Sequence, residues 1–303
     1  MYGPVPSRRL GFSLGVDIIP HKTCSLDCLY CQLGSVRRTT CRRRAYFSVR
    51  GVLAQIRAAL ASGQAIDVIT FSGSGEPTLN RNLGPLIRGI KRMSRVPVAV
   101  LTNGTLLGRE DVRRDLLAAD IVIPSLDAAL AAPFRSVNRP HPSLRLSAII
   151  RGLARFRKEF RGRLWLEVML VRGVNDGPRA LGALKRAVAL IRPDRVQLNT
   201  VVRPPADPAA KPLTARRMEK IARILGDGAE VIADFPARRP SRRAGGFENA
   251  ILAMVKRRPV TAGDIATALG RHRDEVLKAA GRLLGSGKIK SVRHGRNVFY
   301  ESA

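Results

Sequence analysis

Short apolar runs alternate along residues 1–235 with longer stretches in which apolar side chains recur every three or four positions. The short runs predict buried strands at 14–19, 66–71, 98–101, 121–124, 164–171 and 195–200, and a last short strand at 230–235. The longer stretches predict helices at 49–60, 83–93, 109–117, 144–160, 180–191 and 214–225. This alternation predicts an α/β fold with a parallel sheet and right-handed crossovers, in six strand–helix units rather than the eight of a closed barrel.

The pattern changes after this region. Residues 236–246 are basic, rich in proline and glycine, and without an apolar period, which predicts a linker. The tail predicts three short helices and a hairpin, with helices at 247–256, 262–269 and 272–284 and strands at 288–293 and 297–300. This order is typical of a winged helix-turn-helix domain. We therefore predict a core domain at 1–235, a linker at 236–246 and a small winged helix-turn-helix domain at 247–303.

The chain is strongly basic, because 54 Lys and Arg residues face 23 Asp and Glu, which gives a formal net charge of +31. Such an excess favours a polyanionic partner, which is RNA, DNA or a phosphorylated substrate. A compositional bias toward arginine is the alternative, although it accounts poorly for the shortage of acids. Basic residues also lie on the third helix of the tail and on its predicted wing: Arg271, Arg273, Lys278, Arg282, Arg293 and Arg296. A winged helix binds nucleic acid through these two elements, but such a module also binds protein or packs on its own core domain.

Hydrophobic residues make up 45% of the 303 positions, which is enough for a packed core. No apolar run is long enough to span a bilayer, and the N-terminus has no apolar segment of the kind found in signal peptides. These features predict a cytoplasmic protein with no membrane partner. Thiols stay reduced in that compartment.

Three thiols lie within eight residues. Cys24, Cys28 and Cys31 have the spacing Cys-x3-Cys-x2-Cys. A short loop with this spacing can wrap one corner of a [4Fe-4S] cube and ligate three of its irons, which leaves one iron open for substrate. A zinc site would need a second pair of ligands, and none follows. The fourth cysteine, Cys41, stands alone, either as a cysteine with no role or as a labile extra ligand.

This motif, with the aromatic Tyr30 before its third cysteine, resembles the signature of the radical SAM superfamily. The resemblance covers roughly residues 1–235 and implies an open, partial (βα)6 TIM-like barrel. It also implies that S-adenosylmethionine chelates the open iron and that one electron from the reduced cluster cleaves its sulfonium C–S bond. A 5′-deoxyadenosyl radical then abstracts hydrogen from the substrate, and a donor such as flavodoxin or ferredoxin supplies the electron.

A second motif ends the strand predicted after the cysteine loop. Gly73, Ser74, Gly75 and Glu76 resemble the Gly-Gly-Glu-Pro motif of this superfamily, with Ser74 at the first glycine position. The implied role is to grip the amino group of the methionine moiety through backbone groups, assisted by Glu76. An ordinary strand-to-helix turn is the alternative interpretation.

Four more polar residues end predicted strands: Asn103, Ser125, Asp127 and Asn199. At the carboxyl ends of barrel strands they are candidates to contact the ribose, the methionine carboxylate or the substrate. Tyr30 joins them among the residues expected to bind cofactor. Each of the four is also a common turn residue, and no catalytic residue is assigned.

The N-terminal segment 5–11 and the cysteine loop together resemble uncharacterised radical SAM proteins related to the enzymes of wyosine-tRNA synthesis. Those enzymes carry a second cluster, which Cys41 alone cannot build. Wyosine formation is therefore not expected. The expected function is a radical SAM enzyme with RNA as its substrate, as in tRNA modification. The alternatives are an activating enzyme that places a radical on a partner protein, with the tail as its dock, and a cluster-dependent regulator that reads DNA.

Overall fold

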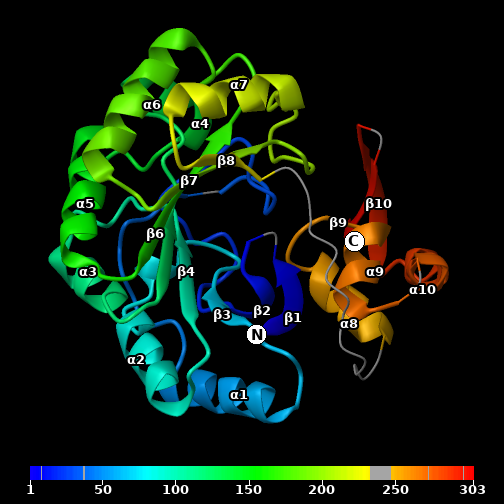
Figure 1. Cartoon of the computed structure of the whole chain (residues 1–303). Coiled ribbons are helices and arrows are strands. Elements are labelled where there is room, and N and C mark those ends of the chain that lie inside the picture. The colour runs from blue at the N-terminus through cyan, green and yellow to red at the C-terminus, as the bar shows by residue number, and fades with distance from the viewer. Residues whose placement is uncertain (8, 37, 233–246, 272, 296) are drawn as a thin grey trace.

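The computed structural model describes residues 1–303 except 8, 37, 233–246, 272 and 296 (Figure 1). Eight strands form one sheet in which sequence order equals spatial order: β1 (Tyr2–Ser7), β2 (Gly11–Val16), β3 (Val68–Phe71), β4 (Val98–Thr102), β5 (Ile121–Pro124), β6 (Arg163–Leu170), β7 (Arg195–Thr200) and β8 (Ala229–Val231). Strands β2 to β8 run parallel, whereas β1 pairs antiparallel with β2. The predicted α/β fold with a mostly parallel sheet is confirmed.

Helices connect the parallel strands and cover the outer side of the curved sheet in Figure 1. They are α1 (Val49–Ala61), the 3-10 turn η1 (Pro77–Leu79), α2 (Leu83–Met93), α3 (Glu110–Leu116), α4 (Ala131–Asn138), α5 (Leu146–Glu159), α6 (Pro178–Ile191) and α7 (Ala215–Leu225). Strand and helix residues form one core in which Ile69, Val100 and Leu166 have no exposed surface. In parallel strands of this kind both faces are buried, and their sequences are continuous apolar runs.

The strand count differs from the prediction. The first parallel strand begins at Gly11 rather than at residue 14, and β1 precedes it at the edge of the sheet. The sequence concealed β1 because Pro4 and Pro6 interrupt it, and prolines within a sheet are confined to edge strands and bulges. The sheet has eight strands where seven were predicted, with β1 as the additional strand, and β1 and β8 do not pair within the described part of the chain. The barrel is therefore partial, as expected.

One helix was missed. No helix was predicted between the strand at 121–124 and the helix at 144–160, but α4 lies there and ends at Asn138, with Arg139 in the left-handed conformation at its C-cap. The helix was hidden because it has only eight residues, too few for a clear apolar period. Its end matters for the site described below.

The tail contains the predicted helices and hairpin: α8 (Phe247–Val255), α9 (Ala262–Leu269), α10 (Arg273–Gly285), β10 (Ile289–His294) and β11 (Asn297–Ser302). Strand β9 (Val260–Thr261) pairs with β11 and completes a three-stranded sheet. Thr261 begins α9 with a capping box that includes Asp264. The tail lies beside β1, and Val5 packs against its separate core (Figure 1). The predicted linker and the domain boundary at 235 lie outside the described residues.

A buried arginine holds the outer layer of helices together. Arg113 of α3 is 1% exposed, and its Nε donates to Glu159 Oε2 of α5 over 2.8 Å. Its Nη1 donates to the carbonyls of Leu107 and Gly108 over 3.1 and 3.0 Å. This side chain thus ties the loop after β4 to two helices.

We expect Arg113→Ala to lower the free energy of unfolding by roughly 2–4 kcal/mol, because two carbonyls and a carboxylate lose their donor. Denaturant titration measures the change. The matched control is Arg114→Ala, whose exposed i,i+4 pair with Glu110 contributes about 0.3–0.5 kcal/mol. Equal effects of the two substitutions would contradict the assigned role of Arg113.

Candidate functional site

The loops that follow β2 to β7 meet at the carboxyl ends of these parallel strands, which is where α/β barrels carry their functional residues. The loop after β2 contains the three cysteines, and the loops after β3, β4 and β5 contain the segments at 73–76, 103 and 125–127. Hydrogen bonds connect these loops to one another directly. The separate sequence motifs therefore lie next to one another at one end of the sheet.

The cysteine loop is held by the segment that ends α4. The amide of Leu29 donates to the carbonyl of Val137 over 3.0 Å, and the amide of Asp27 donates to that of Asn138 over 3.0 Å. Leu26 also forms an isolated antiparallel bridge with Pro140. A loop without regular structure of its own needs such partners for its backbone, so the missed helix α4 determines where the thiols lie.

The three thiols are free and half-buried. The side-chain amide of Asn103 donates to Cys24 Sγ over 3.4 Å, and that of Asn138 donates to Cys28 Sγ over 3.4 Å. Burial raises the pKa of Cys24 to about 12, raises that of Cys28 well above its usual value, and also raises that of Cys31. In this state the thiols are protonated at neutral pH, so any metal they bind must displace protons.

In the part of the chain that the structure describes, no three His, Cys, Asp or Glu side chains converge on a point that would suit a single metal ion. The three thiols are nevertheless close enough to affect one another's pKa. The Sγ atom of Cys41 lies 3.8 Å from the hydroxyl of Ser143, which belongs to another loop.

The loop at 73–76 packs against the chain just before Cys24. The amide of Lys22 donates to the Ser74 carbonyl over 2.6 Å, and the amide of Glu76 donates to the Thr23 carbonyl over 3.0 Å. A Cβ on Gly75 would lie 2.2 Å from that Thr23 carbonyl oxygen, so this close approach requires glycine. The glycine spacing therefore serves to join the two loops.

Asp17 at the end of β2 organises the same turn. Its Oδ2 accepts hydrogen bonds from the Ser74 hydroxyl over 2.6 Å and from the Ser74 amide over 3.1 Å. Gly73 has a φ of +148°, and a Cβ there would lie 2.4 Å from the Asp17 carboxyl carbon. Serine at the position of the family glycine thus gains a partner, and its backbone keeps the required turn.

The Glu76 carboxylate is buried and saturated with hydrogen bonds inside the chain. Its Oε1 accepts from the amide and hydroxyl of Thr78 and from the Thr102 hydroxyl, over 2.9, 2.6 and 2.6 Å. Its Oε2 accepts from the Asn103 amide over 2.6 Å. Burial raises the pKa of Glu76, and these hydrogen bonds oppose the rise. Glu76 therefore fixes Asn103, whose side chain in turn contacts Cys24.

Asp127 connects Tyr30 of the cysteine loop to the strand ends. Its Oδ2 accepts from the Tyr30 hydroxyl over 2.5 Å and from Asn138 Nδ2 over 2.6 Å, and its Oδ1 accepts from the Met169 amide over 2.9 Å. Burial raises the pKa of Asp127 to about 6, although these hydrogen bonds favour the charged form. The Oδ1 atom of Asn138 is buried and has no hydrogen-bond partner among the described residues.

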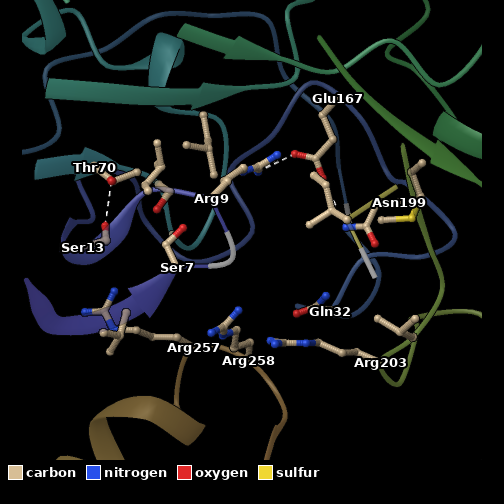
Figure 2. A pocket seen from close by; sticks show the side chains of 18 of the residues that line it. Ser7, Arg9, Ser13, Gln32, Thr70, Glu167, Asn199, Arg203, Arg257 and Arg258 are labelled. Atoms are coloured by element: carbon tan, nitrogen blue, oxygen red, sulfur yellow. Dashed lines mark hydrogen bonds and ion pairs between the residues drawn. The ribbon is translucent and has the colours of Figure 1, made fainter. Parts of the chain in front are cut away.

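A cavity of about 330 Å³ opens beside this network (Figure 2). Of the predicted site residues, Tyr30, Gly73 and Asn199 line it. Glu167 also lines it and accepts a hydrogen bond from Arg9 over 2.6 Å, which supplies the partner that a carboxylate among buried neighbours requires. Ser125 forms an isolated bridge with Glu167 and is not among the lining residues.

Sequence reasoning missed three kinds of participants. Asp17 and Asn138 lie at element ends far from the cysteine motif in sequence, and nothing local distinguishes them from turn residues. Arg9 lies in the N-terminal segment 5–11, which carries a family resemblance but to which no site role was assigned. Arg203, Arg257 and Arg258 line the cavity although two of them belong to the tail. Their only sequence signal is the overall basic charge, which does not single them out.

Comparisons with known proteins agree with this arrangement. Residues 18–181 match the family described as the Radical SAM superfamily. A UPF0026 protein of Methanocaldococcus jannaschii is 32% identical over 308 residues, which cover 99% of this chain and 94% of the relative. A UPF0026 protein of Helicobacter pylori is 33% identical over 99% of this chain and 96% of the relative. The chain therefore belongs to the radical SAM superfamily and to the UPF0026 family.

Another relative is much longer. The chain is 40% identical to the GTPase Obg of Brachyspira hyodysenteriae over 295 residues, which span 96% of this chain but only 43% of that protein. Among solved structures, a radical SAM methyltransferase from Sphaerobacter thermophilus has a TM-score of 0.52 at 22% identity, over 72% of this chain and 65% of that one. The enzyme anSMEcpe with bound AdoMet and a Cp18Cys peptide has a TM-score of 0.51 at 16% identity, over 70% of this chain and 58% of that one. These two structures share the fold. No helix in the described residues has the length and apolar character needed to cross a membrane.

We expect Glu76→Gln to lower the free energy of unfolding by roughly 1–3 kcal/mol, because an amide NH2 would face either the Asn103 amide or the Thr78 and Thr102 donors. Urea titration measures this. Glu110→Gln is the matched control, since its exposed carboxylate only pairs with Arg114 and the expected change stays within about 0.5 kcal/mol. Unchanged stability of the Glu76 variant would show that the carboxylate does not hold the two loops together.

Proposed function

We propose that this chain is an enzyme that holds a [4Fe-4S] cluster through Cys24, Cys28 and Cys31 and binds S-adenosylmethionine beside it. The observation that carries the proposal is the cysteine loop itself: three free, half-buried thiols at the carboxyl end of a barrel strand, in contact with the turn at 73–76. When bound, such a cluster supplies the electron for reductive cleavage of the sulfonium C–S bond.

The three cysteine thiols suit a [4Fe-4S] cluster. Three thiols suit three irons of a cube, each thiolate on its own iron, so the absence of a single point of convergence in the described residues is no obstacle. Two of the sulfurs already accept amide hydrogen bonds, which are interactions that tune cluster potential. The buried Asn138 Oδ1 atom next to Cys28 lacks a donor among the described residues and offers an acceptor to a bound ligand.

The other predicted site residues divide into two roles. Tyr30, Gly73 and Asn199 line the cavity, and we assign them contacts with S-adenosylmethionine or with substrate. Ser74 and Gly75 present backbone groups at the same turn. Glu76, Asn103, Ser125 and Asp127 act as positioning residues, because the bonds of the Glu76 and Asp127 carboxylates are directed into the chain and Asn103 holds Cys24.

We infer that the substrate is RNA. The net charge of +31 favours a polyanion, and the tail has the order of helices and hairpin of a winged helix-turn-helix domain. The exposed side chains of Lys278 on α10 and Arg293 on β10 offer contacts for backbone phosphates. In this interpretation the tail holds the nucleic acid while the barrel performs the reaction.

We expect Cys24→Ser, Cys28→Ser and Cys31→Ser each to abolish bound iron and sulfide and the formation of 5′-deoxyadenosine in anaerobically reconstituted protein. The wild type should hold about four irons per chain. Cys41→Ser is the matched control and should keep both properties, because its sulfur contacts Ser143 on a different loop. Wild-type protein without iron, or a Cys24 variant with full cluster content, would refute the assignment.

RNA binding is tested separately by titrating a structured RNA at several salt concentrations. Lys278→Gln and Arg293→Gln should each weaken binding and reduce the slope of log K against log salt by about 1. Arg88→Gln, an exposed position on α2, is the control and should change neither. Equal affinity for duplex DNA, or no loss in either tail variant, would argue against an RNA substrate held by the tail.

A further inference from the structure

The cavity beside the cysteine loop is closed by two segments far apart in sequence. One is the chain after β7, at 201–203, and the other is the end of α8 with the residues that follow, at 254–258. Each contributes arginine side chains, and Figure 2 shows Arg203, Arg257 and Arg258 along one side of the cavity, with the Arg203 and Arg258 side chains directed toward one another. The core and the tail thus build this wall together.

Arg257 serves mainly to dock the tail on β1. Its guanidinium carbon lies 3.4 Å from the centre of the Tyr2 ring, and its Nη2 donates to the Met1 carbonyl over 3.1 Å. The Nη1 atom is buried without a hydrogen-bond partner in the described chain, and the Asp17 Oδ2 atom is 3.8 Å away. Its cation–π and backbone contacts account for this arginine without a ligand.

Arg258 is different. It is partly buried and makes no hydrogen bond or ion pair of ordinary length to another described residue, although the Asp264 carboxylate acts on its charge electrostatically. Burial lowers its pKa, which means that its charged form is poorly solvated at this position. A buried charge without a partner is costly, so proteins normally pair such groups. The position of Arg258 in the cavity wall points to a partner that comes from outside the chain.

Arg203 lies on the same wall and its side chain is 4% exposed. Its Nη2 is 3.9 Å from Asp264 Oδ2, an oxygen that also accepts the Thr261 amide in the capping box of α9. The Asp264 carboxylate therefore serves both the cap of α9 and the charge of Arg203. Glu167 lines the cavity too, but Arg9 binds it. Together the lining residues include four arginines and one glutamate.

We propose that Arg203 and Arg258 form a site for a phosphate group of the substrate, at the junction of the barrel and the tail. This rests on the proposed function and specifies its substrate as one with a phosphate near the reacting group. Two guanidinium groups on one wall match the charge and the several acceptor oxygens of phosphate. The cavity of about 330 Å³ lies at the lower end of the size range for small-molecule sites, so it would admit one phosphorylated unit rather than a folded nucleic acid.

The test uses full-length protein without iron or S-adenosylmethionine, so its result does not depend on the chemistry of the cluster. Pyrophosphate and a short single-stranded RNA are the two probes, and their binding is measured by calorimetry and by the shift in Tm. Arg258→Gln and Arg203→Gln should weaken binding of at least one probe about tenfold or more. Lys256→Gln, an exposed neighbour with the same change in charge, should bind as the wild type does.

If the arginine variants bind both probes more weakly, or bind only the RNA more weakly, the phosphate belongs to a nucleic acid. If the variants bind only pyrophosphate more weakly, the substrate is a small phosphorylated molecule. Wild-type affinity in both arginine variants would overturn the proposal, as would an equal loss in Lys256→Gln, which would show non-specific attraction to a basic protein. The Tm of each variant without ligand controls for folding, and we expect that of Arg258→Gln to equal or exceed the wild-type value because a partly buried cation that makes no hydrogen bond is removed.

Failure of this site and failure of the proposed function are distinguishable. If the arginine variants bind phosphate normally but the wild-type chain cleaves S-adenosylmethionine, only the phosphate site is wrong. If phosphate binding depends on Arg258 but the reconstituted chain holds no cluster, the proposed enzyme activity is wrong and the anion site remains.

Discussion

The structure of the site depends on backbone pairing between loops that have no regular structure of their own. The chain before Cys24 pairs with the turn at 73–76, and the chain after it pairs with the end of α4. Because each loop supplies the hydrogen-bond partners of the other, neither can adopt its conformation alone. The positions of the thiols consequently depend on the loop after β3 and on the end of α4 as well as on their own spacing.

The acids of this region serve that same constraint. Asp17 holds the Ser74 turn, Glu76 holds Asn103, and Asp127 holds Tyr30. All three carboxylates accept their hydrogen bonds from within the chain, and burial raises the pKa of Glu76 and Asp127. Carboxylates that look like ligand contacts in sequence therefore organise the loops, whereas the cavity wall is formed largely by other residues.

The cations have a different distribution. Arg114, Arg155 and Arg271 are exposed and pair with acids four residues away on their own helices. Arg9, Arg203, Arg257 and Arg258 instead gather around one cavity, and two of them come from the tail. The tail is thereby part of the pocket and not only an appendage, since Arg257 packs on Tyr2 and Arg258 faces the space beside it.

The sequence alone determined what depends on local pattern. Continuous apolar runs identified the parallel strands from β3 to β7, the apolar period at 262–269 identified α9, and the cysteine spacing identified the candidate ligands. Strand order then predicted which polar segments share one end of the sheet. These inferences hold because burial and helix geometry impose periods that a single segment displays.

Tertiary structure decided whatever depends on contacts between distant segments. The edge strand β1 forms despite its prolines because one side of it needs no strand partner, and α4 is too short to show a period. The roles of Asn138 and Asp17 depend on neighbours more than 50 residues away in sequence, because Asn138 and Cys28 are 110 residues apart and Asp17 and Ser74 are 57 apart. Likewise Arg258 could be distinguished from the other basic residues only once the tail was seen against β1, because the environment that makes its charge unusual is built by the core and the tail together.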